Sequence, residues 1–470
     1  MPRRCLVVVI PLHARAWAEE EFSHAELGDQ RRTRRLVAMA ARAACRPAGT
    51  VTRVYDRSAE REAAFRLIES DGFSYRDVVS ASCRATVRRA ASHAFAFVAV
   101  DGSTLTLADK SSAVFGPVSN KGAARGMQAM TALVVSPDGV PLGIASQELW
   151  VRPEKSAPDH HHDNRPILER ETRFWLEVVG QVTAAFRAEA PHTQPWFQMD
   201  RGADCAPVLE MASKLGIAFT IRACYDRRLT DGRKLWRALA QARHLGSYLL
   251  DVSAGPKRLA RRTRIDVRAT RVNLELKMGV RCGPRVGVSV WALEARERNP
   301  PRGEPPVLWR LLTNRRVTTR GAAMQVVAGY AQRWTVEEFH YAWKSGLCDI
   351  ERSQLRDPEH FAKWATLLAA VAVRAERLKK LSREQPELPA SLEFTRDEID
   401  AVILLRKPAG FTVGAEPTLG DVVRWVADLG GYTGKSSGGP PGAKVIGRAL
   451  PEIVAAASAI AALRTKGGNG

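Results

Sequence analysis

The spacing of apolar and polar residues divides the chain into helical and strand-rich stretches. Residues 17–90 carry apolar side chains at helical intervals, and Asp29 stands where it can cap the segment "QRRTRRLVAMAARAA". From residue 94 short apolar runs take over, and "MTALVVSPDGVPLGIASQELW" predicts a strand, an Asp-Gly turn and a second strand. Alternating β-branched residues over 260–313 predict a further β-rich block. After residue 321 the pattern is helical to about 382, and "SREQPELPASLEF" is interpreted as a linker to a last helical region. The pattern predicts an α/β protein.

Two of the short apolar runs lead directly into an aspartate. "AFAFVAV" is followed by Asp101, and "PWFQM" is followed by Asp200 and then by the start of a helix. We therefore expect two strands that each deliver a carboxylate at their end. Aspartate is common at strand ends because it favours turns, so neither residue alone indicates a function.

The segment "YAQRWTVEEFHYAWK", residues 330–344, has four polar side chains at helical spacing. At about 100° per residue, Arg333, Glu337 and Lys344 fall roughly 300°, 340° and 320° from Tyr330. One continuous helix would therefore place all four on a face roughly 60° wide. A salt-bridged structural helix is one interpretation, since Arg333 and Glu337 are an i,i+4 pair. The other is a functional face with a carboxylate, two cations and a phenol among aromatic residues.

The net charge of +21 over 470 residues gives information about the binding partner of the protein. A chain of this length predicts two to four domains. Charge on this scale favours a polyanion such as nucleic acid, because Lys and Arg bound to phosphates release counterions. An anionic membrane surface, or solubility alone, is the alternative. Basic residues recur along the whole chain, which fits a protein that binds nucleic acid with several of its domains.

Cysteine usage and hydropathy indicate a reducing, aqueous compartment. The seven cysteines are scattered without a C-x-x-C pair, which argues against a disulfide framework or a zinc module. No tract of eighteen apolar residues is found, so no membrane span is expected. The start, "MPRRCLVVVIPLHARA", has an apolar run of only about six residues and is interpreted as an N-terminal extension. "HHHD" at 160–163 is interpreted as a solvated loop. We expect a cytoplasmic protein.

Two carboxylates at strand ends and a third on a later helix, Glu337, suit the binding of divalent cations. Mg²⁺ prefers oxygen ligands and is usually held by a few carboxylates together with water and substrate phosphate. Paired metal ions activate a nucleophile and stabilise the leaving oxygen in phosphoryl transfer.

The polar residues of the 330–344 segment resemble the YREK signature of bacterial DDE transposases of the IS-four type, and in particular the Tn-five type. Tyr330, Arg333, Glu337 and Lys344 have the order and spacing of that signature. Further segments match in kind and order: "ELGDQRRTRRLV" at 26–37, "VDGST" at 100–104, "ELWVRPE" at 148–154, "MDRGAD" at 199–204 and "VLWRLLT" at 307–313. The resemblance covers most of the chain.

The resemblance implies an RNase H-like catalytic core with an inserted β-rich subdomain, flanked by helical domains. The resemblance implies that this chain has a DNA-end-binding domain at 1–90, a catalytic domain at 91–385 and a dimerisation domain at 386–470. The β-rich insertion is expected at about 206–306, the interval in which the residue pattern already indicates strands.

The resemblance also implies roles for individual residues. Asp101, Asp200 and Glu337 correspond to the DDE triad that binds Mg²⁺, with Mn²⁺ as a substitute. Tyr330, Arg333 and Lys344 correspond to a clamp on the phosphate near the transposon end, and guanidinium forks suit phosphate oxygens. Trp309 corresponds to the residue that receives a flipped base, although a core tryptophan is the alternative. The remaining candidate DNA contacts are Arg222 and the arginines of the N-terminal helix: Arg31, Arg32, Arg34 and Arg35.

The implied activity is metal-dependent cleavage of transposon ends through a hairpin, followed by strand transfer into target DNA by a homodimer in a paired-end complex. The alternatives are an inactive DNA-binding relative and a stand-alone nuclease. The sequence departs from the Tn-five type at Cys224, where a lysine is usual, and at Gly202, where a glutamate is usual. Arg227 or Arg228 is a candidate replacement for that lysine.

Overall fold

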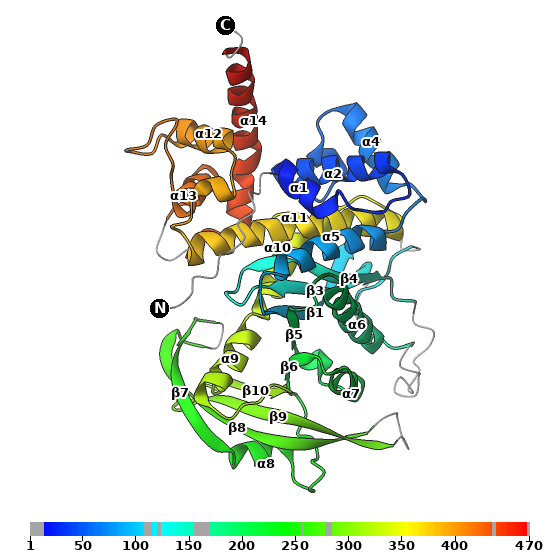
Figure 1. Ribbon diagram of the computed structural model, residues 1–470, viewed down its shortest axis with the longest axis vertical. Coiled ribbons are helices and arrows are strands. Elements are labelled where there is room, and N and C mark those ends of the chain that lie inside the picture. The colour runs from blue at the N-terminus through cyan, green and yellow to red at the C-terminus, as the bar shows by residue number, and fades with distance from the viewer. Residues whose placement is uncertain are drawn as a thin grey trace.

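The computed structural model describes residues 14–107, 114–119, 124–154, 169–255, 258–277, 284–434 and 439–467. Most of the N-terminal extension and the "HHHD" stretch at 160–163 lie outside the described residues. Along the chain, a helical region precedes a mixed sheet with helices on it, and a second helical region follows (Figure 1).

The N-terminal region is helical, as the sequence predicts. Asp29 caps the second helix, and its side chain accepts a hydrogen bond from the Arg31 amide. Ser74 and Asp77 form a capping box at the start of the fifth helix, which satisfies amides that the helix itself leaves unpaired. The helices are α1 (Ala14–Phe22), α2 (Gln30–Cys45), α3 (Val51–Val54), α4 (Ser58–Ile68) and α5 (Tyr75–Ala90).

The centre of the fold is a ten-stranded sheet with the order β2-β3-β1-β5-β6-β10-β9-β8-β7, in which β4 pairs with β3. The pairs β1–β5 and β5–β6 are parallel, and the other pairs of named strands are antiparallel. The predicted strand–turn–strand unit is confirmed as the β3–β4 hairpin. The strands are β1 (Phe95–Leu107), β2 (Gly116–Pro117), β3 (Arg125–Val135), β4 (Pro141–Trp150), β5 (Gln194–Met199), β6 (Ala218–Arg222), β7 (Arg243–Val252), β8 (Arg261–Lys277), β9 (Arg285–Glu297) and β10 (Leu308–Thr313).

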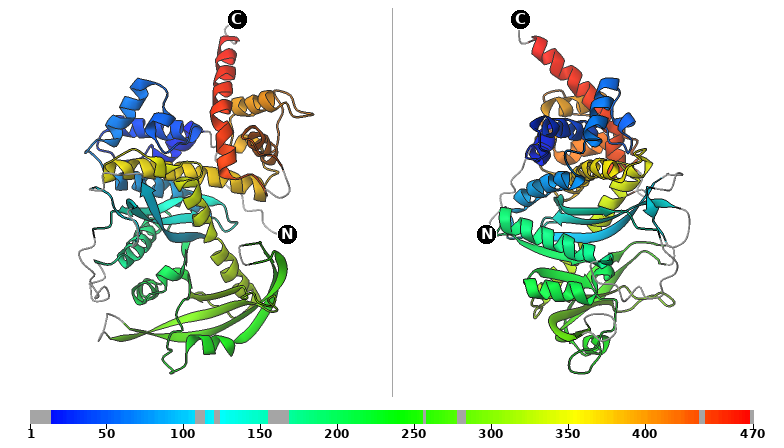
Figure 2. Two further views of the ribbon diagram at one scale, coloured as in Figure 1. Left: turned by 180° about the vertical axis from the view of Figure 1, so that it is seen from behind. Right: turned by 90° about the vertical axis from the view of Figure 1, so that its right-hand side faces the viewer.

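Helices cover both faces of the sheet at β1, because successive side chains of a strand point to opposite faces. Phe97 and Ala99 pack into one core with helices α9 (Arg320–Ala331), α10 (Trp334–Lys344) and α11 (Pro358–Glu384). Val98 and Val100 pack into the other core with α5, α6 (Thr172–Glu189) and α7 (Ala206–Leu215). The two views of Figure 2 show these layers from behind and from the side.

A glycine allows α9 to lie close against β1. A Cβ atom at Gly329 would stand 2.6 Å from the ring of Phe97, closer than real Cβ contacts allow. Because α9 precedes α10 directly, this contact also fixes where α10 begins relative to β1.

In the chain, the strands β7, β8 and β9 and the short helix α8 (Leu235–Ala240) come between β6 and β10. In the sheet, these strands extend beyond β10 as a curved layer (Figure 1). The buried face changes along β8. Ile265 and Val267 pack into the core that contains α9, whereas Val272 and Leu274 pack into the core that contains α7. Each end of the β8–β9 ribbon therefore leaves a different face exposed.

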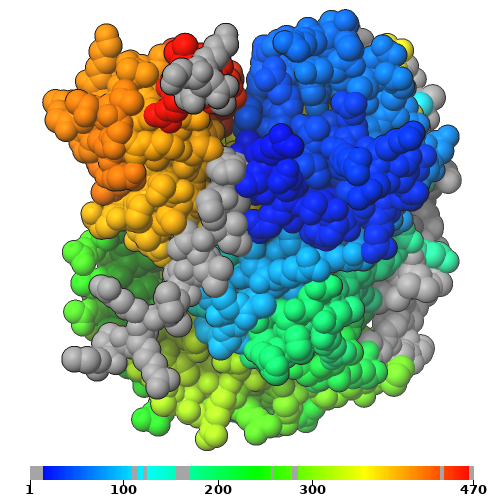
Figure 3. All heavy atoms as spheres, turned by 45° about the horizontal axis from the view of Figure 1, so that its top comes forward, coloured from blue at the N-terminus to red at the C-terminus, as the bar shows by residue number. Residues whose placement is uncertain are grey.

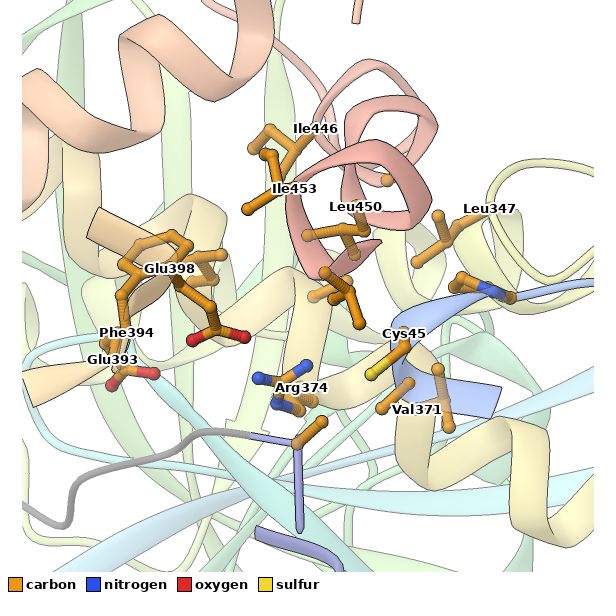
Figure 4. A pocket seen from close by; sticks show the side chains of 17 residues that line it. Cys45, Leu347, Val371, Arg374, Glu393, Phe394, Glu398, Ile446, Leu450 and Ile453 are labelled. Carbon is orange, nitrogen blue, oxygen red and sulfur yellow. The ribbon is translucent and has the colours of Figure 1, made fainter. Parts of the chain in front are cut away.

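The C-terminal region consists of α11, α12 (Arg396–Arg406), α13 (Leu419–Leu429) and α14 (Ala443–Gly467). It lies beside the N-terminal helices on one face of the molecule (Figure 3). A small cavity of about 30 Å³ marks the junction, with Cys45 from α2, Arg374 from α11 and Ile453 from α14 around it (Figure 4).

The expectation that no segment spans a membrane rests on the lack of an unbroken tract of eighteen apolar residues. Residues Ala443–Arg464 of α14 form one helix long and apolar enough to cross a bilayer. Arg448 and Glu452 interrupt the apolar run of this helix, whereas an average of the hydropathy over its length tolerates them. Such a single helix is weak support for membrane insertion, and Ile446 and Ile453 are buried against α12 and α13.

Candidate active site

Parallel pairing of β1 and β5 places two aspartates next to each other. Val100 lies opposite Met199 in the register, so Asp101 and Asp200 are the next residues on neighbouring strands. Asp200 follows the end of β5, as predicted, and its side chain accepts a 2.7 Å hydrogen bond from the amide of Gly202.

The prediction that β1 ends at Asp101 is wrong. The strand continues to Leu107, because the residues after Asp101 pair with β3 as far as Arg125. Asp101 therefore lies within a strand and is buried, which leaves its carboxylate more strongly desolvated than a strand-end position would.

Arg333 joins the first aspartate to the glutamate of the later helix. Its guanidinium lies 3.3 Å from a carboxylate oxygen of Asp101 and 3.1 Å from one of Glu337. The Arg333 side chain is only 13% exposed, so both interactions are partly shielded from water.

One continuous helix over residues 330–344 was predicted, and this is wrong. Helix α9 ends at Ala331 and α10 begins at Trp334. At the junction the amides of Arg333 and Thr335 bond to carbonyls three residues back, to Tyr330 and Gln332, in the tighter 3₁₀ pattern. Tyr330 therefore lies on α9 and Arg333 lies at the junction, from which Arg333 contacts Asp101.

The charge around Asp101 is predominantly negative. The pKa of Asp101 is raised to about 7: burial raises it most, Arg333 lowers it, and the carboxylates of Asp200 and Glu337 also raise it. The pKa of Arg333 is raised: burial lowers it, but Asp101, Tyr330 and Glu337 outweigh burial. The charges of Asp101, Asp200, Glu337 and Arg333 are therefore close enough to shift the pKa values of Asp101 and Arg333.

The residues fit a divalent cation in donor chemistry, since the site offers carboxylate oxygens and negative charge that Arg333 only partly neutralises. Among the described residues, no three His, Cys, Asp or Glu side chains already stand close enough to hold one ion. Arg333 stands between two of the acids, so cation binding would require its guanidinium to move from at least one of them.

Tyr330, Trp309 and Arg222 lie beside this cluster. The rings of Trp309 and Tyr330 pack edge to face with centroids 5.2 Å apart, and Tyr330 is buried. Burial raises the pKa of Tyr330, while the nearby Arg333 and Arg222 lower it. Arg222 pairs with Leu311 of β10 at the end of β6. The structure thus brings together Asp101, Asp200, Glu337, Arg333, Tyr330, Trp309 and Arg222.

Three family models match the chain in sequence order. They are described as Transposase DNA-binding over residues 14–72, Transposase DDE domain over 176–374, and Transposase Tn5 dimerisation domain over 370–466. The chain has the domain architecture of a DNA transposase. The predicted fold is thereby confirmed: the central mixed sheet contains the RNase H-like core of the DDE domain, and helical regions flank it.

The same matches indicate partners and chemistry for the transposase. The first indicates DNA, the last a second copy of the chain, and the DDE domain a DNA-processing enzyme that depends on a divalent metal. Asp101 lies outside all three matched ranges, so its assignment rests on the pairing of β1 with β5.

Lys344 lies at the end of α10, with its Nζ atom 3.8 Å from Glu351. Among the described residues its ion pair is with Glu351 rather than with Asp101 or Glu337, and its part in the phosphate clamp stays a prediction. Between Lys344 and Arg333 lies His340, which is buried against Phe339 and Trp343.

His340 should make the stability of the transposase depend on pH. Burial, together with Lys344 and Arg333, lowers the pKa of His340 to about 3. The unfolded chain therefore binds a proton that the folded chain does not, and stability is lost as the pH falls below about 6.5. We expect His340 to account for a loss of about 1.4 kcal/mol per pH unit between about pH 6 and 4.

Urea unfolding of wild type and His340→Leu, followed by tryptophan fluorescence from neutral to acidic pH, checks this. The variant should lose less stability on acidification than wild type. His192→Leu, at an exposed position, is the matched control and should keep the wild-type slope. Equal slopes for all three proteins would contradict the prediction.

The four arginines of α2 have different environments. Arg31, Arg34 and Arg35 are exposed. Arg32 is half-buried and donates to the carbonyl oxygens of Leu27, at 3.0 Å, and Gly72, at 3.3 Å, so it ties two loops together. Arg34 donates a 3.2 Å hydrogen bond to the side chain of Gln30 on the same helix, whereas Arg32 bonds to residues outside α2.

The departures from the Tn-five pattern can be located. Cys224 is exposed at the end of β6, and its amide donates to the buried Asp204. Arg227 binds the same Asp204 at 2.7 Å, whereas Arg228 is 62% exposed with Glu275 3.9 Å away. Arg228 is therefore the better placed of the two to replace a lysine.

Sequence reasoning gave no role to two aromatic side chains next to Glu337. Trp334 is 62% exposed and Tyr341 is 59% exposed. They line a hollow of about 550 Å³ with Glu337, Lys379 and Arg383. Their seven-residue spacing, two helical turns, was the available signal that they share a face.

Proposed function

We propose that this transposase cuts the ends of a mobile element, such as an insertion sequence, and joins them to target DNA by phosphoryl transfer at Asp101, Asp200 and Glu337. The observation that carries the proposal is the arrangement of the acids. Asp101 and Asp200 lie next to each other across the parallel pair of β1 and β5. The guanidinium of Arg333 contacts both Asp101 and Glu337.

Asp101, Asp200 and Glu337 would hold the divalent cations, with Mg²⁺ as the expected ion and Mn²⁺ as a substitute. When bound, such ions lower the pKa of water and stabilise the leaving oxygen of the cleaved strand. The carboxylates would orient the reacting groups, and the burial of Asp101 keeps bulk water from screening its charge.

Arg333, Tyr330 and Lys344 would hold the phosphate next to the cleaved bond. A guanidinium prefers the paired oxygens of phosphate, so DNA can draw Arg333 away from the carboxylates that it contacts in the free protein. This exchange would clear the space between Asp101 and Glu337 as the substrate arrives. Arg222, and Arg31, Arg34 and Arg35 of α2, would contact the flanking duplex.

Two chains would act together on paired ends, each chain contributing one active site. The match to a dimerisation domain over 370–466 supports this arrangement. With DNA as the partner, the protein would work in the cytoplasm at the nucleoid.

The single test of the proposal is incubation of a labelled DNA fragment carrying the element's ends, and a target plasmid, with Mg²⁺ or Mn²⁺. Hairpin ends followed by insertion into the plasmid are the expected products. Hydrolysed ends without insertion would instead make the protein a nuclease. Binding without cleavage in either metal would leave an inactive DNA-binding relative.

Trp309 should matter for the hairpin more than for the first cut. Stacking of a displaced base on indole contributes about 1–3 kcal/mol, so Trp309→Ala should slow hairpin formation about five- to 150-fold. Gel analysis of single-turnover reactions separates the nicked strand from the hairpin. Trp309→Phe, which keeps a ring against Tyr330, should retain most of the hairpin rate. Equal slowing of nicking and hairpin formation would show that Trp309 only supports the fold.

A further inference from the structure

One face of β8 carries a row of charged side chains. Arg264, Asp266 and Arg268 alternate with Ile265 and Val267, which are buried in the core that contains α9. Because successive residues of a strand point to opposite faces, the charged residues all lie on the outer side of the sheet.

This outer side is turned away from the candidate active site. In the register, Trp309 of β10 lies opposite Ala295 of β9, which in turn lies opposite Val267 of β8. Trp309 therefore lies on the same side of the sheet as Val267, the inner side that faces α9. Arg296 lies opposite Asp266 and shares the outer side.

The acids on the outer side are already paired with arginines. Three ion pairs account for the carboxylates: Asp251 with Arg262 at 3.7 Å, Asp266 with Arg298 at 2.7 Å, and Glu294 with Arg310 at 2.8 Å. These pairs leave no net charge of their own.

Three further arginines on the same side have no carboxylate partner. Arg264, Arg268 and Arg296 are exposed, and within the part of the chain that the structure describes no carboxylate oxygen lies within 4.0 Å of their guanidinium groups. Arg268 donates a 2.8 Å hydrogen bond to the carbonyl of Ala240, which leaves its charge unneutralised. We call Arg264, Arg268 and Arg296 the outer arginines.

The outer arginines are spread out rather than gathered around one point. At about 3.3 Å per residue, Arg264 and Arg268 lie roughly 13 Å apart along β8, and Arg296 stands on the neighbouring strand between them. A strand of duplex DNA carries a phosphate about every 3.4 Å of helix axis, so the same span holds about four phosphates. This spacing suits a polymer of phosphates better than a single small anion.

We propose that the outer arginines bind the phosphate backbone of a duplex DNA segment, without reading its sequence, on the face opposite the active site. The segment is not the one at the carboxylates, because the sheet separates the two faces. The proposal rests on the proposed function only in taking DNA as the partner. It gives the transposase a second place to hold DNA, such as target or flanking DNA, while the active site is occupied.

The test uses the full chain and a labelled duplex of arbitrary sequence, without divalent metal, between about 50 and 200 mM salt. The variant is Arg264→Gln, Arg268→Gln and Arg296→Gln combined. Each lost phosphate contact should reduce the slope of log affinity against log salt by about one. The combined variant should therefore show a slope shallower by about two to three, and an affinity about tenfold or more weaker at low salt.

The matched control removes three charges from exposed positions of the same two strands at the other end of the ribbon: Arg271→Gln, Lys277→Gln and Arg285→Gln. It should keep the wild-type slope. A wild-type slope in the outer variant, or an equal change in both variants, would overturn the proposal. So would a loss confined to phosphatidylserine vesicles with DNA binding intact, which would make this face a membrane contact.

Should the combined variant fail to fold, Arg264→Gln and Arg296→Gln alone should each reduce the slope by about one. Because binding is measured without metal or turnover, its result does not depend on cleavage. Failure of wild type to cut DNA would therefore sink the proposed function and leave this inference standing.

Discussion

Replacing Asp101 or Glu337 with alanine should reduce cleavage of the element's ends by at least about a thousandfold, or about 4 kcal/mol of transition-state stabilisation. Asp101 is buried beside two other acids, and Arg333 connects it to Glu337. Loss of either carboxylate removes negative charge that a divalent cation needs and leaves Arg333 with one partner. Single-turnover cleavage of a labelled end fragment measures the effect.

Binding measurements separate this prediction from a loss of folding or of DNA affinity. Asp101→Asn keeps the size of the side chain and should lose cleavage as fully as Asp101→Ala, while the end fragment is still bound. Glu338→Gln, next to Glu337 on α10 and paired with Lys379, is the matched control and should stay within about threefold of wild type. Cleavage by the Asp101 variants at the wild-type rate would show that Asp101 is not part of the active site.

Replacing Arg333 with alanine should change two measured quantities in opposite directions. Cleavage should fall at least about a hundredfold, because a bidentate contact to phosphate is lost where charge develops. Mn²⁺ binding to the DNA-free protein should become tighter, because the guanidinium no longer neutralises Asp101 and Glu337. Electron paramagnetic resonance of free Mn²⁺ measures the second effect.

Arg333→Lys is the informative companion variant. It keeps the positive charge but not the fork, so Mn²⁺ binding should stay near the wild-type value while cleavage remains impaired. Asp101→Ala should weaken Mn²⁺ binding, opposite in sign to Arg333→Ala. If Arg333→Ala leaves Mn²⁺ binding unchanged or weaker, the guanidinium does not compete with metal in the free protein.

The sequence by itself determined the features that depend on near neighbours along the chain. The Asp-Gly turn between β3 and β4 and the cap at Asp29 follow from local backbone preferences, and the structure contains both. Alternation of apolar residues located the β-rich block that became β8, β9 and β10. The order of Asp101, Asp200 and Glu337 supported the family resemblance before any contact was known.

The tertiary structure decided what depends on residues far apart in the chain. Only the parallel pairing of β1 with β5 places Asp101 beside Asp200, and only packing brings Arg333 against Asp101. Local periodicity favoured one helix over 330–344. In the structure α9 ends at Ala331 and α10 begins at Trp334, and the close approach of Gly329 to Phe97 places α9 against β1. Helical propensity is summed over neighbours within a turn or two, whereas the ends of these helices are set by burial and ion pairs that no local pattern contains.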